Sequence, residues 1–198
     1  MNQDDFEVLN DAFLPEDPDV PDTPETSYPI DAVDLSCYNS AQETKIDWAK
    51  IKADVGFLVL RCGCTRLKAK PLGVGGDISF EKRAQKCKEM GIPFWAYYYS
   101  PPKDADQVRE EARIAFKIAE KYRPLGYCMD CEEGALNRVK IKAWFDEIKK
   151  LGTKHTMLYV GHNWVPMYKL PTDESGFIVV ADAIWIPRHS KNDGTLNQ

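Results

Sequence analysis

The feature that most constrains the fold of this chain is a repeated alternation of short apolar runs with longer amphipathic segments from Ile30 onward. Strands that are separated by helices in this way run parallel, because each helix crosses back over the sheet. The sequence therefore predicts an α/β protein, either a doubly wound sheet or a (β/α) barrel. The predicted strands cover residues 29–36, 56–62, 92–99, 125–132, 154–160 and 183–188.

Three of the intervening segments carry sequence signals for the ends of helices. The segment over 79–91 begins with Ser and ends with Gly, which are favoured capping residues. The segment over 104–122 has Asp104 and Gln107 in the spacing of a capping box, and the segment over 137–152 ends with Gly. Each segment has one apolar face at helical spacing. The residues expected on these faces are Phe80, Ala84 and Cys87, then Val108, Ala112, Ala115, Ala119 and Tyr122, and then Ile141, Phe145 and Ile148.

The first 29 residues differ in composition from the rest of the chain. They contain nine acidic residues, five prolines and no Lys or Arg. Such a segment buries too little apolar surface to offset the entropy of ordering it. We therefore expect residues 1–29 to form an acidic, proline-rich arm or linker. Residues 30–198 are expected to form one domain, since the whole chain of 198 residues is too short for two.

The charge of the remaining 169 residues limits the kinds of molecule that the protein is expected to bind. They hold 26 basic and 22 acidic residues, a net charge of +4 without a basic cluster. Nucleic-acid binding is not expected, whereas a mildly basic body suits an anionic surface such as a bacterial cell wall. The sequence contains no run of 18 apolar residues, so membrane insertion is not expected. The start MNQDDFEVLND has neither the basic nor the apolar region of a Sec signal peptide, so a substrate outside the cytoplasm would require another route.

Acidic residues lie at the ends of two predicted strands. Asp34 ends the first strand, and Asp130 and Glu132 end the fourth, in the segment GYCMDCEE. Because side chains alternate along a strand, Asp130 and Glu132 face the same side. The carboxyl ends of parallel strands meet at one edge, so Asp34 is expected beside them, although a single acid at a strand end is often only a helix cap or an ion-pair partner.

Carboxyls a few ångströms apart raise each other's pKa, which gives a protonated acid beside an ionised partner near neutral pH. Glycoside hydrolysis needs such a set, with one carboxyl to protonate the leaving oxygen and another to stabilise the positive transition state. Aromatic side chains at the strand ends supply flat apolar faces on which sugars stack, although buried tyrosines are also common in protein cores. These candidates for substrate binding are Tyr97, Tyr99, Tyr159 and Trp185.

The six cysteines offer a different interpretation of the same segment, as a metal or redox site. Without a secretion signal they are expected to be reduced, and most to be small buried apolar residues. Strand alternation sends Cys128 and Cys131 to opposite faces, so this pair cannot bind one metal ion, whereas Cys62 and Cys64 are expected to share a face. A four-cysteine zinc site would require the end of the fourth strand to curl into a turn, and we expect no metal.

Six segments between Ile30 and about Arg188 resemble, in order, the lysozymes of glycoside hydrolase family 25, which are N-acetylmuramidases common among phage endolysins. AVDLSCYN resembles the first strand of the family, and GYCMDCEE resembles its Leu-Asp-Val-Glu strand. The other four are KIDWAKIKADVGFLVLRCGCT, GDISFEKRAQKCKEMGIPFWAYYYS, MLYVGHNW and IWIPRH. The resemblance implies a TIM-like (β/α)5(β)3 barrel that cleaves the β-1,4 bond between N-acetylmuramic acid and N-acetylglucosamine in peptidoglycan, without a cofactor.

Carried over by position, the resemblance makes Glu132 the general acid. Asp130 would polarise the 2-acetamido group of the substrate or stabilise the positive anomeric carbon, and Asp34 would hold this pair in its charge state. Whether an acetamido-derived oxazoline or direct attack by water follows stays open. The sequence departs from the family at residues 62–64, where the family often has Ala-Thr-Glu, and at Pro187 and His189, where it often has Ala and Tyr.

The resemblance also implies two further strands after the sixth, the last carrying another Asp, but the sequence ends at SKNDGTLNQ soon after the sixth run. We therefore expect a barrel that is incomplete at its C-terminus, with a further segment or a partner chain covering the open edge. The alternative function is a catalytically silent, lysozyme-like structural or wall-binding module of a phage particle. The expected location is the host cytoplasm until lysis, or the virion, with action on the bacterial cell wall.

Overall fold

The computed structural model describes residues 32–64, 76–100, 104–132, 137–161 and 181–185. The predicted arm over 1–29 and the positions Pro187 and His189 lie outside these residues. The described elements are β1 (Ala32–Leu35), η2 (Cys37–Lys45), α1 (Trp48–Asp54), β2 (Phe57–Cys64), α2 (Phe80–Met90), β3 (Phe94–Tyr99), α3 (Ala105–Ala119), η3 (Glu120–Tyr122), β4 (Tyr127–Cys131), α4 (Arg138–Lys150), β5 (Thr156–Val160) and β6 (Ala183–Trp185).

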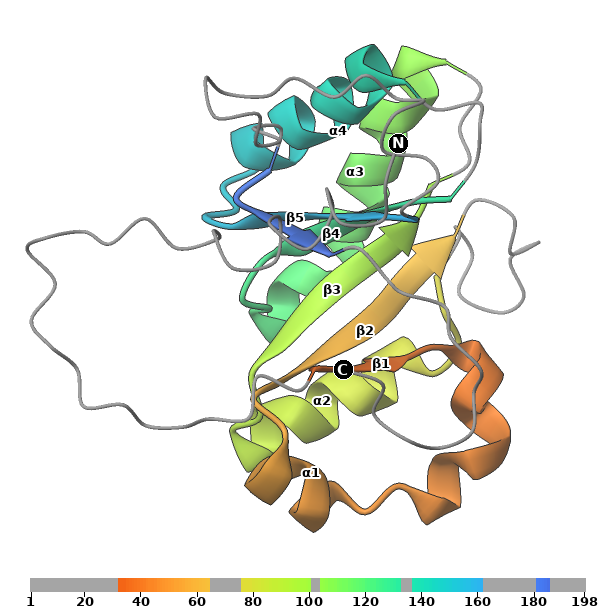
Figure 1. Ribbon diagram of the computed structural model, residues 1–198, viewed down its shortest axis with the longest axis vertical. Helices are drawn as coiled ribbons and strands as arrows, with labels where there is room; N and C mark the ends of the chain where they lie inside the picture. Colours follow the sequence, from red (N-terminus) through yellow and green to blue (C-terminus); the bar gives the residue numbers. More distant parts are fainter. Residues whose placement is uncertain (1–31, 65–75, 101–103, 133–136, 162–180, 186–198) are drawn as a thin grey trace, which may run out of the picture.

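All six predicted strands are present, and they form one sheet in the order β1-β2-β3-β4-β5-β6. Every neighbouring pair is parallel, as the alternation of strands and helices predicts. The sheet is curled, with α1 and α2 near the β1 and β2 end and α3 and α4 near β4 and β5 (Figure 1). Sequential parallel order with helices between the strands is the arrangement of a TIM-like barrel, and the described strands form an incomplete one.

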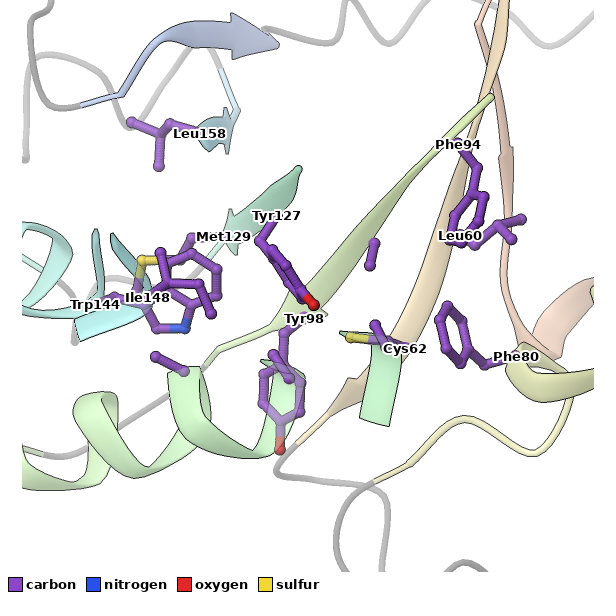
Figure 2. Packing of buried hydrophobic residues seen from close by; sticks show 14 of the residues in the cluster. Leu60, Cys62, Phe80, Phe94, Tyr98, Tyr127, Met129, Trp144, Ile148 and Leu158 are labelled. Carbon is purple, nitrogen blue, oxygen red and sulfur yellow. The ribbon is translucent and has the colours of Figure 1, made fainter. Parts of the chain in front are cut away.

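The two faces of the sheet have different roles. One face, here called the helix face, packs against α2, α3 and α4 and contains the large core, including Leu60 of β2, Tyr98 of β3 and Met129 of β4 (Figure 2). Trp144 and Ile148 of α4 belong to this core and lie near Met129 of β4 (Figure 2). The opposite face, here called the cavity face, has a smaller cluster of buried residues. These are Val59, Tyr97, Cys128 and Met157.

The helix ends predicted from the sequence are largely confirmed, with one change of detail. α2 ends at Gly91 in the left-handed conformation (φ 67°), and Asp104 caps α3 by accepting a hydrogen bond from the Gln107 backbone N–H at 2.8 Å. Ser79 occupies the N-cap of α2, but its side chain makes no capping hydrogen bond. The Ser79 backbone N–H donates to the Asp77 carboxylate at 2.9 Å. The predicted buried faces are confirmed except for Tyr122, which is only partly buried.

A β-bulge interrupts β2 near its carboxyl end. Arg61 pairs with Tyr97, but Gly63 pairs with Tyr98, so β2 has one residue more than β3 over this stretch. Alternation is therefore shifted by one residue beyond the bulge, and Cys64 lies opposite Tyr99.

None of the helices within the described ranges is both long and apolar enough to cross a membrane.

Candidate active site

A cavity of about 420 Å³ opens at the carboxyl ends of the strands, on the cavity face of the sheet. Parallel α/β sheets place functional side chains at this edge. The structure brings all seven predicted site residues to the lining of this one cavity. They are Asp34, Tyr97, Tyr99, Asp130, Glu132, Tyr159 and Trp185. The lining also includes Ser36, Tyr38 and Arg61, which the sequence analysis did not identify, and Cys64, which it considered only for a zinc site.

The three carboxyls reach the cavity from two separate strands. Asp34 lies in β1, Asp130 lies in β4, and Glu132 follows β4 directly. Two strands, β2 and β3, separate β1 from β4 in the sheet. The curvature of the sheet nevertheless brings the three charges close enough to affect one another, since Glu132 and Asp34 both raise the pKa of Asp130.

Asp130 is the most enclosed of the three carboxyls. Its side chain is buried, and among the described residues its Oδ1 atom has no hydrogen-bond partner. Burial raises the pKa of Asp130 well above its ordinary value, the negative charges of Glu132 and Asp34 raise it further, and the Arg61 guanidinium opposes the shift. Asp130 therefore retains its proton at a pH where an exposed aspartate is ionised.

Asp34 keeps contact with solvent through the cavity but lies in a depression formed by protein atoms. This partial desolvation raises the pKa of Asp34 to about 6, while a hydrogen bond with the Tyr97 side chain and the charge of Arg61 hold it lower than burial alone would. The negative charge of Glu132 also raises this pKa. Asp34 thus changes its charge close to neutral pH.

Two tyrosines pair with two of the carboxyls. The Tyr97 side chain hydrogen-bonds Asp34, and the Tyr159 side chain hydrogen-bonds Glu132. Burial and the neighbouring acidic groups raise the pKa of both phenols, so each hydroxyl remains protonated and can donate to the carboxyl group beside it. Tyr159 also packs edge-on against Trp185, with ring centroids 4.6 Å apart and an interplanar angle of 79°.

Arg61 is the most informative residue that the sequence analysis missed. It is 6% exposed and lines the cavity, and its Nε donates to Asp77, which is fully buried, at 2.8 Å. Its Nη2 donates to the Cys37 sulfur at 2.6 Å. A signal was present in the sequence, because an arginine inside the apolar run GFLVLRC requires a buried partner.

The cysteines considered for the alternative metal or redox site lie on both faces of the sheet. Cys128 belongs to the cavity face and Cys131 to the helix face, so the predicted separation of this pair is confirmed. The prediction that Cys62 and Cys64 share a face is wrong, because the β2 bulge leaves Cys62 in the helix-face core and turns Cys64 to the cavity. In the described part of the chain, no group of three or more His, Cys, Asp or Glu side chains could hold a metal ion.

The arrangement can move a proton beside a developing positive charge. It combines a deeply buried carboxyl that resists ionisation, a second that titrates near pH 6, and a third that is exposed at the cavity. Carboxyls held in such different environments divide the roles of acid and of charge stabiliser between them. The aromatic side chains around them provide apolar contact surface for a ring-shaped substrate.

Comparisons with known proteins support the fold. No family model matches the sequence, and a search of curated proteins finds no match. Among solved structures, GHIP, a glycosyl hydrolase 25 of Streptococcus pneumoniae, is similar with a TM-score of 0.69 and 19% identity over 84% of this chain and 72% of that one. The catalytic domain of endolysin ply40 from a bacteriophage of Listeria monocytogenes is similar with a TM-score of 0.68 and 21% identity, over 84% of this chain and 77% of that one.

The spore cortex lytic enzyme SleM of Clostridium perfringens is also similar, with a TM-score of 0.58 and 20% identity over 80% of this chain and 56% of that one. At these identities the likeness concerns the fold. It agrees with the six-stranded parallel sheet and with the expectation of an incomplete TIM-like barrel. The chain therefore has the α/β fold of glycoside hydrolase family 25 structures.

Proposed function

We propose that this protein is a glycoside hydrolase that cleaves peptidoglycan at the β-1,4 bond between N-acetylmuramic acid and N-acetylglucosamine. The observation that carries the proposal is the convergence of Asp34, Asp130 and Glu132 on one cavity lined with aromatic side chains. The substrate class is supported by the similar structures, which include an endolysin, a spore cortex lytic enzyme and an autolysin in complex with a synthetic peptidoglycan ligand.

Glu132 is the proposed general acid. It is exposed at the cavity, where the glycosidic oxygen of a bound glycan is within reach, and its hydrogen bond with Tyr159 fixes its orientation. In the reaction the Glu132 carboxyl gives its proton to the glycosidic oxygen as the bond to the anomeric carbon breaks. The leaving sugar departs with a new hydroxyl group.

Asp130 is proposed to polarise the 2-acetamido group of the substrate or to stabilise the positive anomeric carbon, and Asp34 is proposed to hold Asp130 and Glu132 in their charge state. Asp130 lines the cavity that would receive the substrate, next to Glu132. Asp34 in its ionised form disfavours ionisation of Asp130 through their mutual repulsion. Asp34 thereby sets the charge state of Asp130 and Glu132. The arrangement is compatible with attack on the anomeric carbon either by the acetamido oxygen or by water.

A lytic assay with a matched control tests the proposal. Wild type, Glu132→Gln and Glu89→Gln are compared on purified cell walls by loss of turbidity, and the released reducing sugar is identified after borohydride reduction. Removing a general acid lowers rates by about a hundred- to ten-thousand-fold. We expect that loss for Glu132→Gln only, since Glu89 lies on α2 outside the cavity.

The same assay distinguishes the alternative function. Clearing by wild type and Glu132→Gln at equal rates would contradict the assigned role of Glu132. Wall binding without clearing by any variant would support a silent wall-binding module of a phage particle. An active enzyme would act on the bacterial wall either as an endolysin held in the host cytoplasm until lysis or as a part of the virion.

A further inference from the structure

We propose that Tyr38 is a sugar-stacking platform that forms a second glycan-binding subsite at the β1 end of the cavity. The inference rests on the proposed function, because it concerns how the same site holds a glycan. Tyr38 lines the cavity, yet its side chain is 80% exposed, so most of the ring is open to a ligand. An aromatic ring presented in this way offers a flat apolar face to a pyranose ring.

The second face of the Tyr38 ring is already occupied. The guanidinium carbon of Arg61 lies 4.9 Å from the ring centroid, in the position of a cation–π contact. Arg61 is itself fixed by Asp77 and by the Cys37 sulfur. The tyrosine therefore rests on a buried, anchored support and not on a mobile surface side chain.

The backbone that carries Tyr38 is also held in place. The Cys37 N–H donates to the Asp77 carboxylate at 2.8 Å, and the Ser36 carbonyl accepts from Arg83 Nη1 at 2.8 Å. The Ser36 hydroxyl accepts from the Tyr38 N–H at 3.4 Å. Three buried side chains, Ser36, Asp77 and Arg83, thus order this turn before any ligand arrives. Such preorganisation reduces the entropy that a ligand must overcome on binding.

The position of Tyr38 complements the aromatic pair at the other end of the sheet. Tyr38 follows β1 at one end, whereas Trp185 lies in β6 at the other end and packs against Tyr159 of β5. The carboxyl of Asp130 comes from β4, between these ends. A glycan that crosses the strand ends would therefore have one sugar on Trp185 and another on Tyr38, with the scissile bond between them.

Binding measurements in a catalytically silent background test this subsite. The probes are a peptidoglycan tetrasaccharide of alternating N-acetylglucosamine and N-acetylmuramic acid and the corresponding disaccharide, titrated calorimetrically into Glu132→Gln. Adding Tyr38→Ala is expected to weaken tetrasaccharide binding roughly tenfold, as expected for the loss of one stacking contact. Tyr38→Phe keeps the ring and should retain binding, as should Val139→Ala, an exposed position on α4 outside the cavity.

The outcomes separate this inference from the proposed function. Equal tetrasaccharide affinity in Tyr38→Ala and its parent would overturn the platform and leave the hydrolase proposal intact. Failure of both wild type and Glu132→Gln to bind either sugar would remove the glycan assignment itself, and the platform with it. A loss in Tyr38→Ala that is larger for the tetrasaccharide than for the disaccharide would establish the subsite.

Discussion

Replacing Asp34 by asparagine should make the protein more stable at neutral pH while impairing the site. Partial desolvation raises the pKa of Asp34 to about 6 in the folded chain, from 3.8 for an ordinary aspartate. The stability that this group contributes is fully present below pH 4 and is lost as the pH rises through about 6. Asparagine does not ionise, so Asp34→Asn avoids this loss.

The size of the effect follows from the same two values. A difference of about two pH units corresponds to at most about 3 kcal/mol of unfolding free energy. Asp34 keeps solvent contact through the cavity, and solvent screening reduces this figure, so we expect a gain of about 1 kcal/mol at pH 8. For a domain of this size, that gain raises the melting temperature by roughly 2–4 °C.

Denaturant unfolding of wild type and Asp34→Asn at pH 4, 6 and 8 measures this gain. The difference between the two proteins should be near zero at pH 4, grow through pH 6 and level off at pH 8. Asp54→Asn is the control, because Asp54 is an exposed aspartate on α1 whose partner is Lys50. A variant that is no more stable than wild type at pH 8, or that gains equally at pH 4, would refute the reasoning.

Two further predictions concern buried groups other than the three cavity carboxyls Asp34, Asp130 and Glu132. Asp77→Ala leaves the buried Arg61 cation without its ion-pair partner, so the free energy of unfolding measured in denaturant titrations should fall by about 3–5 kcal/mol. The isosteric Asp77→Asn should lower it less. A loss below about 1 kcal/mol in Asp77→Ala would contradict the importance of this pair. Burial raises the pKa of the Cys87 thiol to about 12 and raises those of Cys62, Cys128 and Cys131 well above the ordinary value, so these four thiols should react with a disulfide reagent only after denaturation. Their rapid modification in the native protein would show that the cores on both faces of the sheet open readily.

The sheet and the convergence of the acids could be predicted because both depend on local periodicity. Strand and helix periods fix the order of the elements, and parallel strands bring their carboxyl ends to one edge. Alternation then determines that Asp130 and Glu132 share a side, and both line the cavity. None of these steps requires knowledge of which distant residues meet.

The environment of the acids could not be predicted because it depends on contacts between distant residues. Arg61 and Asp77 are 16 positions apart, and nothing in either local pattern identifies the other as its partner. Tyr38 lies in a 3-10 helix that lacks the apolar periodicity of α2 to α4, so no pattern in the sequence predicts that it lines the cavity. The hydrogen bond that Asp77 accepts from the Ser79 backbone N–H just before α2 could not be predicted either, because Ser79 itself stands at the usual capping position.

The single extra residue in β2 has a consequence for comparing this chain with others. Beyond this residue, each side chain of β2 points to the opposite face from the one that uninterrupted alternation would give. Arg61 before it and Cys64 after it therefore both reach the cavity, although they are three positions apart. A homologous strand one residue shorter here would present a different side chain to the cavity, with its neighbouring sequence unchanged. Column-by-column alignment across this point would then equate a cavity residue with a core residue.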